Sequence, residues 1–218
     1  ISFGILSNQT NNFHYLSEGF GANSRTTMLG ELAEAAYGYR ESVLKEYNSF
    51  NNSDVPWDIL TAYQGGMLDT YGLGDAYVGA DQAISEDGSY IYLPGTLTQT
   101  ACQTKYGSKN DLILNLGMNF SDQFYLGFNI GIPTARYRYN EDFYEAAVNP
   151  RDFLIQYDDG HDTYFLNGSS SYQYLAEMAG IYAKIGFIFR PIDGLRLGAS
   201  IQTPTSYTIS ESWAYSAA

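Results

Sequence analysis

Cysteine and basic residues are both scarce in this sequence. Cys102 is the only cysteine among 218 residues, so the chain can form neither an internal disulfide nor a cysteine-based metal site. Lys and Arg number 11 against 24 Asp and Glu, which gives a net charge of −13. Because contacts to phosphate backbones need basic side chains, this balance argues against nucleic acid as a partner.

Long hydrophobic runs and chemical motifs are missing as well. No stretch of 18 apolar residues occurs, so the sequence predicts no transmembrane helix. Glycines 72, 74 and 79 lack the dinucleotide-binding spacing, and the acidic run 158–162 lacks the spacing of a calcium-binding EF-hand loop. Nothing resembles a Ser-His-Asp or Cys-His set. We therefore expect no enzymatic activity, no cofactor and no bound metal.

Tyrosine and glycine are abundant instead. The chain has 21 Tyr and 22 Gly, while charged residues make up only 16%. This composition fits an outer-membrane barrel, which carries girdles of aromatic residues and a lumen lined by small side chains. A tyrosine-rich soluble β protein is the alternative.

The stretch from Asp111 to Pro133 has the clearest pattern in the chain. Every second residue is large and apolar on both sides of Ser121-Asp122, and most residues between them are Gly or Asn. Side chains alternate between faces along a strand, so this stretch predicts a tight antiparallel hairpin with one apolar face. Pairing Leu116 with Phe128 keeps the large residues on the same side.

The apolar face has two interpretations. In a soluble sandwich it points into a core, whereas in an outer-membrane barrel it points toward lipid. The opposite face of Gly and Asn, and run lengths of about ten residues, favour lipid. The connections do too: Ser121-Asp122 and Asp193-Gly194 are short turns, whereas about Asn8–Gly95 and about Tyr139–Ser171 are long loops, as outer-membrane barrels have.

Other strands follow the same alternation. We expect them at Ile1–Ser7, Tyr172–Arg190 and Leu195–Ile201, and we expect the chain to leave the apolar band from Pro204 onward. So few strands cannot close a barrel, which takes about eight. The predicted fold is therefore all-β, with residues 1–218 forming part of a larger antiparallel transmembrane β-barrel.

The first long loop carries helical signals. Thr27 is placed to cap a helix that runs to Tyr37, Val43 and Leu44 suggest a second, and Pro56 suits the first turn of another. Their apolar side chains could form a groove that captures a hydrophobic ligand, with Arg25 or Arg40 meeting a carboxylate head. The groove candidates are Met28, Leu29, Leu32, Trp57, Leu60 and Tyr63. Mutual packing of the helices needs the same spacing and is the favoured interpretation.

Charged and polar residues in the strands have two interpretations each. Lys184, Arg196 and Gln202 share the predicted lumen face, where they could guide an anionic solute or simply provide ordinary polarity. Arg136 and Arg138 keep lipid-facing parity beyond the apolar band. There they could meet the phosphates of the surface leaflet, although interfacial charges that extend to water are the favoured interpretation.

Several ordered segments resemble one family. They are Gln123–Asp142 (QFYLGFNIGIPTARYRYNED), Phe187–Trp213 (FIFRPIDGLRLGASIQTPTSYTISESW), the opening ISFGILSNQTNNF and the YLPG at Tyr92–Gly95. Together they resemble the FadL/TodX outer-membrane transporters, particularly members of the Bacteroidetes type.

The resemblance implies a barrel of roughly fourteen strands with an N-terminal hatch, in the outer membrane of a Gram-negative bacterium. Membrane lipid and lipopolysaccharide would surround it. It would take up hydrophobic compounds, such as long-chain fatty acids, by diffusion through the barrel. The alternative is a non-transporting barrel of the same fold that acts as a surface scaffold or secretion partner and binds another protein.

Overall fold

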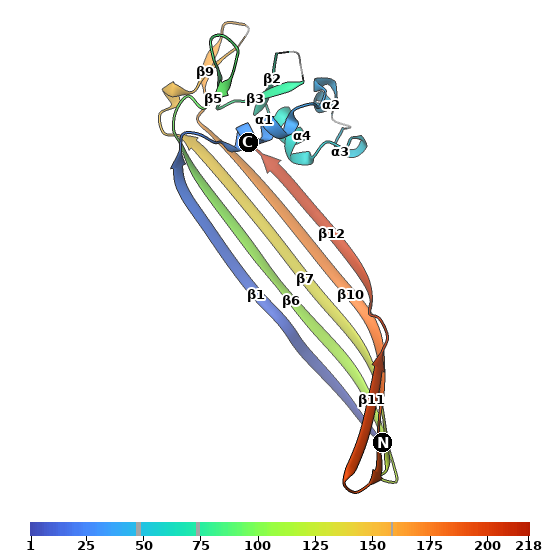
Figure 1. Cartoon of the computed structure of the whole chain (residues 1–218). Helices are drawn as coiled ribbons and strands as arrows, with labels where there is room; N and C mark the ends of the chain where they lie inside the picture. The colour runs from blue at the N-terminus through green and yellow to red at the C-terminus, as the bar shows by residue number, and fades with distance from the viewer. Residues whose placement is uncertain (47–48, 73–74, 158) are drawn as a thin grey trace. The chain divides into compact units, whose positions relative to one another are not determined.

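Long strands and short helices make up the protein (Figure 1). The computed structural model describes residues 1–46, 49–72, 75–157 and 159–218, so Asp158 of the acidic run lies outside it. The contacts divide the chain into two compact units. The first unit comprises Ile1–Tyr15, Thr104–Tyr139 and Tyr174–Trp213, and the second comprises Leu16–Gln103, Asn140–Gln173 and Ala214–Ala218.

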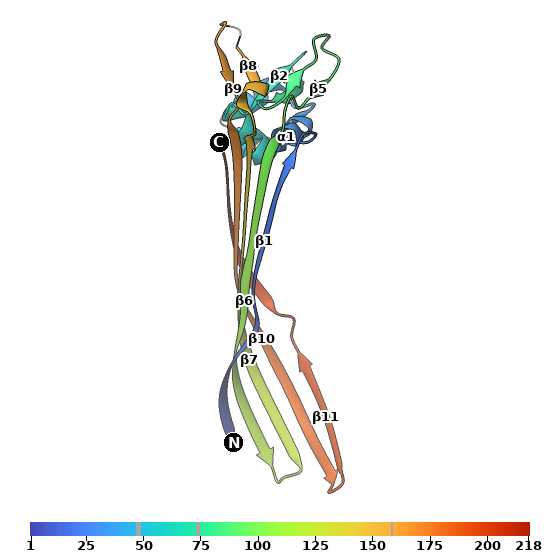
Figure 2. The same cartoon turned by 90° about the vertical axis from the view of Figure 1, so that its left-hand side faces the viewer.

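One sheet contains the long strands. Its order is β1-β6-β7-β10-β11, and β12 also pairs with β10. Figures 1 and 2 show β1, β6, β7 and β10 running side by side. The strands are β1 Ser2–Asn23, β6 Leu97–Phe120, β7 Phe124–Ala147, β10 Asn167–Ile192, β11 Leu195–Gln202 and β12 Ser206–Ala217. The all-β class predicted from the sequence is confirmed.

The turn between β6 and β7 forms where the sequence predicts it. Ser121 and Asp122 have φ of 54° and 57°, and the Gln123 N–H bonds back to the Phe120 carbonyl at 3.1 Å, as in a β-turn of the primed type I′. The Asn119 side chain secures the turn by donating to Asp122 Oδ1 at 2.6 Å. Further along, Asn115 donates to Asn129 across the strands. This contact is the one expected when Leu116 pairs with Phe128.

The second short turn, after Ile192, joins β10 to β11. Phe189 pairs with Leu197 and Ile192 with Leu195, and the register shifts between these two pairs. The shift spans Pro191, which has no N–H to donate to the ladder. Proline thus explains the irregularity next to this turn.

The strands extend further than their alternation indicated. β1 continues to Asn23 rather than Ser7, and β10 starts at Asn167 rather than Tyr172. β12 forms after Pro204, where the sequence predicted only that the chain leaves the apolar band. The predicted ends of β1 and β10 were wrong because pairing with a neighbouring strand, rather than an apolar face, makes mixed polar segments extended.

A close approach between β7 and β10 requires glycine at position 131. The Tyr182 ring occupies the space where a Cβ on Gly131 would stand. The same tyrosine donates to Asp111 Oδ2 at 2.8 Å. The Tyr182 side chain therefore spans from β10 across Gly131 to β6.

Gly131→Ala is expected to destabilise the protein by about 1–3 kcal/mol, because the methyl group would displace the Tyr182 ring. Gly127→Ala is the matched control, since its added Cβ would lie 3.8 Å from the nearest atom, the Gly186 oxygen. Urea unfolding measures the free energy of unfolding of both variants. Equal stabilities would show that Tyr182 moves aside without cost.

The second unit contains the helices and three small hairpins. The helices are α1 Met28–Ala36, α2 Glu41–Lys45, α3 Ser49–Asn52 and α4 Trp57–Gln64, with the 3₁₀ turn Pro150–Asp152. The hairpins pair β2 Leu68–Tyr71 with β3 Ala76–Gly79, β4 Ala83–Ile84 with β5 Ile91–Tyr92, and β8 Leu154–Gln156 with β9 Asp162–Tyr164. None of the described helices is long and apolar enough to cross a membrane.

The predicted helices form within one residue of the expected positions: α1 ends at Ala36 rather than Tyr37, and Pro56 precedes α4 rather than lying in its first turn. The Thr27 side chain caps α1 by accepting the Leu29 N–H, and Pro56 directly precedes α4. Gly65 follows α4, and its N–H bonds back to the Thr61 carbonyl. Capping by Thr satisfies one of the N–H groups that a helix start leaves unpaired.

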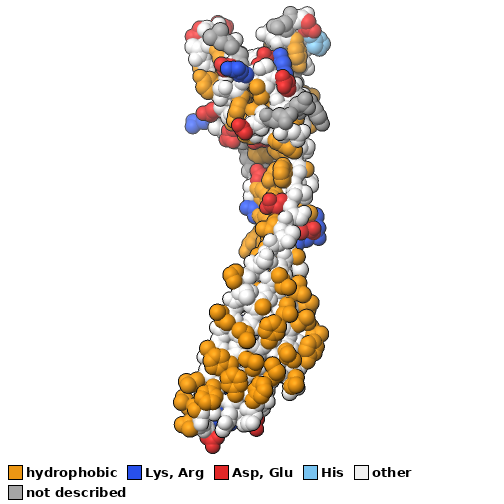
Figure 3. Space-filling model, turned by 90° about the vertical axis from the view of Figure 1, so that its right-hand side faces the viewer, with side chains coloured by type: hydrophobic (Ala, Val, Ile, Leu, Met, Phe, Trp, Pro, Cys, Tyr) orange, Lys and Arg blue, Asp and Glu red, His pale blue; other side chains and the backbone are white. Residues whose placement is uncertain are grey.

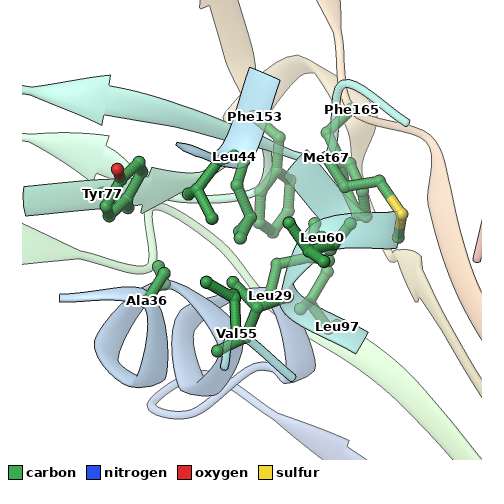
Figure 4. Close-up of a cluster of buried hydrophobic side chains, with 14 residues drawn as sticks. Leu29, Ala36, Leu44, Val55, Leu60, Met67, Tyr77, Leu97, Phe153 and Phe165 are labelled. Carbon is green, nitrogen blue, oxygen red and sulfur yellow. The ribbon is translucent and has the colours of Figure 1, made fainter. Parts of the chain in front are cut away.

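The core of the second unit gathers helices and strand ends around aromatic rings (Figure 4). Its buried members include Leu29, Ala36, Leu44, Val55, Leu60, Met67, Tyr77, Leu97, Phe153 and Phe165. The Phe153 ring packs against Gly95, where an added Cβ would lie 2.7 Å from Cε2. The helices of the first long loop thus share a hydrophobic core with residues of the second long loop.

Candidate functional site

The strands of the first unit leave large apolar side chains uncovered. Phe128, Ile185 and Leu197 are all exposed, and Ile201 is 71% exposed. Figure 3 shows hydrophobic side chains gathered on a continuous surface over these strands. Soluble monomers seldom expose such extensive apolar patches.

The opposite face of the same strands carries a mixture of side chains. It contributes Gly117, Asn129, Lys184 and Ser200 to a cavity of about 700 Å³ that is also lined by Ile1, Met118, Leu126, Phe187 and Ile188. Lys184 pairs with Gln202 across β10 and β11, so the structure brings together two of the three residues predicted for the lumen.

The third predicted lumen residue, Arg196, is exposed on β11. It follows the same alternation as Gly198 and Ser200, which line the cavity, but is not among the cavity's lining residues. The Lys184 ammonium group and the neighbouring amide and hydroxyl groups can donate hydrogen bonds to an anionic solute.

Arg136 and Arg138 both have partners within the first unit. Arg136 Nε lies 3.2 Å from Glu177 Oε1, and both side chains are about half exposed, so the ion pair adds little stability. The Arg138 guanidinium lies 5.4 Å from the centre of the Tyr106 ring, and His14 meets the same ring edge-on. Both arginines thus contact other side chains of the strands, one through an ion pair and the other through an aromatic ring.

The groove candidates in the helices lie mostly in the core of the second unit. Leu29 and Leu60 are fully buried, and Met28, Leu32 and Tyr63 pack partly buried against the same cluster. These contacts favour mutual packing of the helices over an open groove.

The remaining groove candidates are more accessible. Trp57 is 39% exposed, and its indole donates to the Phe50 carbonyl at 2.8 Å. Arg25 and Arg40 are exposed, so either guanidinium is accessible to an anionic group. A role in ligand capture stays a prediction for all eight residues.

A buried polar cluster in the second unit was missed by sequence reasoning. Thr27, Asp81 and Glu145 are buried, and Gln99 donates to Glu145 Oε2 at 3.2 Å. Thr27 is 54 residues from Asp81 and 118 from Glu145, so no local motif could reveal the cluster. Among the described residues, no group of three or more His, Cys, Asp or Glu could hold a metal ion.

Comparison with models of known protein families, with curated proteins and with solved structures found no match to this chain.

Proposed function

We propose that the chain belongs to an outer-membrane β-barrel of a Gram-negative bacterium. The observation that carries this proposal is the uncovered apolar face of the first unit, backed by a face on which Gly, Asn, Ser and Lys184 lie among a few larger residues such as Tyr125 and Ile188. In an outer-membrane barrel the apolar face meets lipid and the polar face lines the lumen. The tight hairpin turns and the long connections agree with such a barrel.

We further propose that this barrel takes up hydrophobic compounds, such as long-chain fatty acids. The similarity of Gln123–Asp142 and Phe187–Trp213 to the FadL/TodX transporters supports this proposal. Trp57, Arg25 and Arg40 are accessible and are the residues best placed to meet an amphipathic ligand.

A non-transporting barrel that acts as a surface scaffold or secretion partner is the second candidate. The burial of Leu29 and Leu60 favours it, because these side chains stabilise the helical unit instead of contacting a ligand. A structured unit with its own core can present a surface to another protein.

Uptake of a radiolabelled long-chain fatty acid distinguishes the two candidates. Cells that lack the gene are expected to take up several-fold less than cells carrying it, because fatty acids cross the outer leaflet slowly without a channel. Replacing both Trp57 and Arg40 by Ala is expected to lower uptake. Tyr37→Ala, at a 73% exposed position outside the candidate groove, is the matched control.

Outer-membrane fractions should contain equal amounts of each variant, so that uptake reports on transport. Equal uptake with and without the gene would contradict the transport proposal and favour the scaffold.

A further inference from the structure

Three buried side chains of the second unit form a continuous polar network. Asp81 is 1% exposed and Glu145 is 0% exposed. Between them lies the Thr27 hydroxyl, which is within hydrogen-bonding distance of Asp81 Oδ2 and lies 2.9 Å from Glu145 Oε1. The ion pairs among the described residues involve neither acid. Two buried carboxyl groups without a cationic partner are costly if both are ionised, so one of them needs a proton or another positive charge close by.

Each hydrogen bond of this polar network has a donor that can be identified. Glu145 Oε2 accepts the Met28 N–H at 3.1 Å and the Gln99 amide at 3.2 Å. Thr27 Oγ1 accepts the Leu29 N–H at 3.1 Å, so its single proton remains to be donated. That proton can go to only one of the two acids.

Glu145 is the acid that takes the Thr27 proton, because its N–H donors stabilise an ionised carboxylate. The contact between Thr27 and Asp81 then requires a hydrogen from Asp81. With Asp81 protonated, the hydroxyl accepts twice and donates once, which uses its full capacity.

The second oxygen of Asp81 supports the same assignment. Oδ1 is buried without a hydrogen-bond partner and lies 2.8 Å from where a Cβ on Gly79 would stand, next to Leu29. An ionised carboxylate would carry part of its charge on this undonated oxygen, which is costly in apolar surroundings. Burial and, to a lesser degree, the charge of Glu145 raise the pKa of Asp81 to about 7, although the hydrogen bond with Thr27 acts in the opposite direction.

We propose that a proton held by Asp81 completes the polar network from Asp81 through Thr27 to Glu145 and thereby stabilises the packing of the start of α1 against β6 and β7. Thr27 caps α1, Glu145 belongs to β7, and Gln99 of β6 donates both to Glu145 and to the Thr26 carbonyl at 3.2 Å. Loss of the proton breaks the contact at Thr27 and loosens the second unit. This inference concerns the second unit alone and does not rest on transport.

The direction of the pH dependence follows from the raised pKa. Asp81 binds its proton more tightly in the folded than in the unfolded chain, so this stabilisation is complete below about pH 4 and is lost as the pH rises through about 7. Glu145 of β7 is the titratable group that faces Asp81, whereas Thr27 of the α1 cap and Gln99 of β6 are neutral.

Asp81→Asn tests the proposal, because its amide donates the same bond without titrating. The full chain is unfolded with urea in detergent micelles between about pH 5 and 9, and Trp57 fluorescence is followed in a Trp213→Phe background. Relative to Asp81→Asn, the unfolding constant of the unsubstituted chain is expected to rise about tenfold per pH unit up to about pH 7, then level off.

Asp87→Asn is the matched control for this titration. Hydrogen bonds from Ser85 and Ser89 lower the pKa of Asp87 to about 2, so removing it should leave the pH dependence above about pH 5 unchanged. Parallel curves for the unsubstituted chain and Asp81→Asn would overturn the proposal.

Infrared spectroscopy of the unsubstituted chain, labelled with ¹³C-aspartate, needs no variant to fold. Exposed aspartates are ionised at about pH 6, so a protonated aspartate carboxyl band is expected there from Asp81 alone and should disappear as the pH rises through about 7. Absence of this band at about pH 6 would also overturn the proposal. Stabilisation of the unsubstituted chain, but not of Asp81→Asn, by Ca²⁺ would mean that a cation bridges the acids, and would reject the proton.

Discussion

Ile201→Arg is expected to destabilise the protein in membranes by about 2–4 kcal/mol if the position lies near the bilayer midplane, and by less toward the interface. The physical reason is the transfer of a guanidinium into hydrocarbon. In water the same change should shift stability by no more than about 0.5 kcal/mol, because a side chain that is 71% exposed makes few contacts to lose. The size of the destabilisation therefore shows whether lipid or water surrounds the apolar face.

Gln202→Arg is the matched control, since neighbouring residues of a strand point to opposite faces. Urea unfolding in lipid vesicles and in the outer-membrane fraction measures both variants. A similar small effect of both substitutions would mean that the apolar face does not meet lipid, and the membrane proposal would have to be withdrawn.

Phe153→Ala is expected to lower the free energy of unfolding of the second unit by about 3–5 kcal/mol. The Phe153 ring is 1% exposed, contacts Gly95 and lies 6.2 Å from the Phe165 ring, centre to centre. Removing the ring leaves a cavity that a core of helices and strand ends can refill only partly. Urea unfolding followed by Trp57 fluorescence, in the Trp213→Phe background, measures the loss.

Leu154→Ala provides the control for this cavity, because Leu154 is the next residue and is 43% exposed. Its truncation should cost less than about 1 kcal/mol. Equal losses for the two variants would falsify the assignment of Phe153 to the core of this unit.

The hairpin Asp111–Pro133 was predictable from the local sequence pattern. Alternating large and small residues fixed its strands, and Ser121-Asp122 fixed the turn, because both signals depend only on neighbours in the chain. The cap at Thr27 and the helix start after Pro56 were predictable for the same reason.

The ends of the long strands were not predictable in this way. Residues 8–23 of β1 and the whole of β12 alternate weakly, and their extended form depends on the neighbouring strand that supplies the hydrogen bonds. The helical residues Leu29 and Leu60 had two possible roles, and only tertiary packing placed them in a core.

The sequence by itself determined the all-β class, the alternation of faces, the tight turns and the helix starts, because each depends on residues a few positions apart. Only the tertiary structure decided the full strand lengths, the core of the second unit and the meeting of Thr27, Asp81 and Glu145. Those features join segments distant in the chain, and burial, which raises the pKa of Asp81, exists only after they have come together.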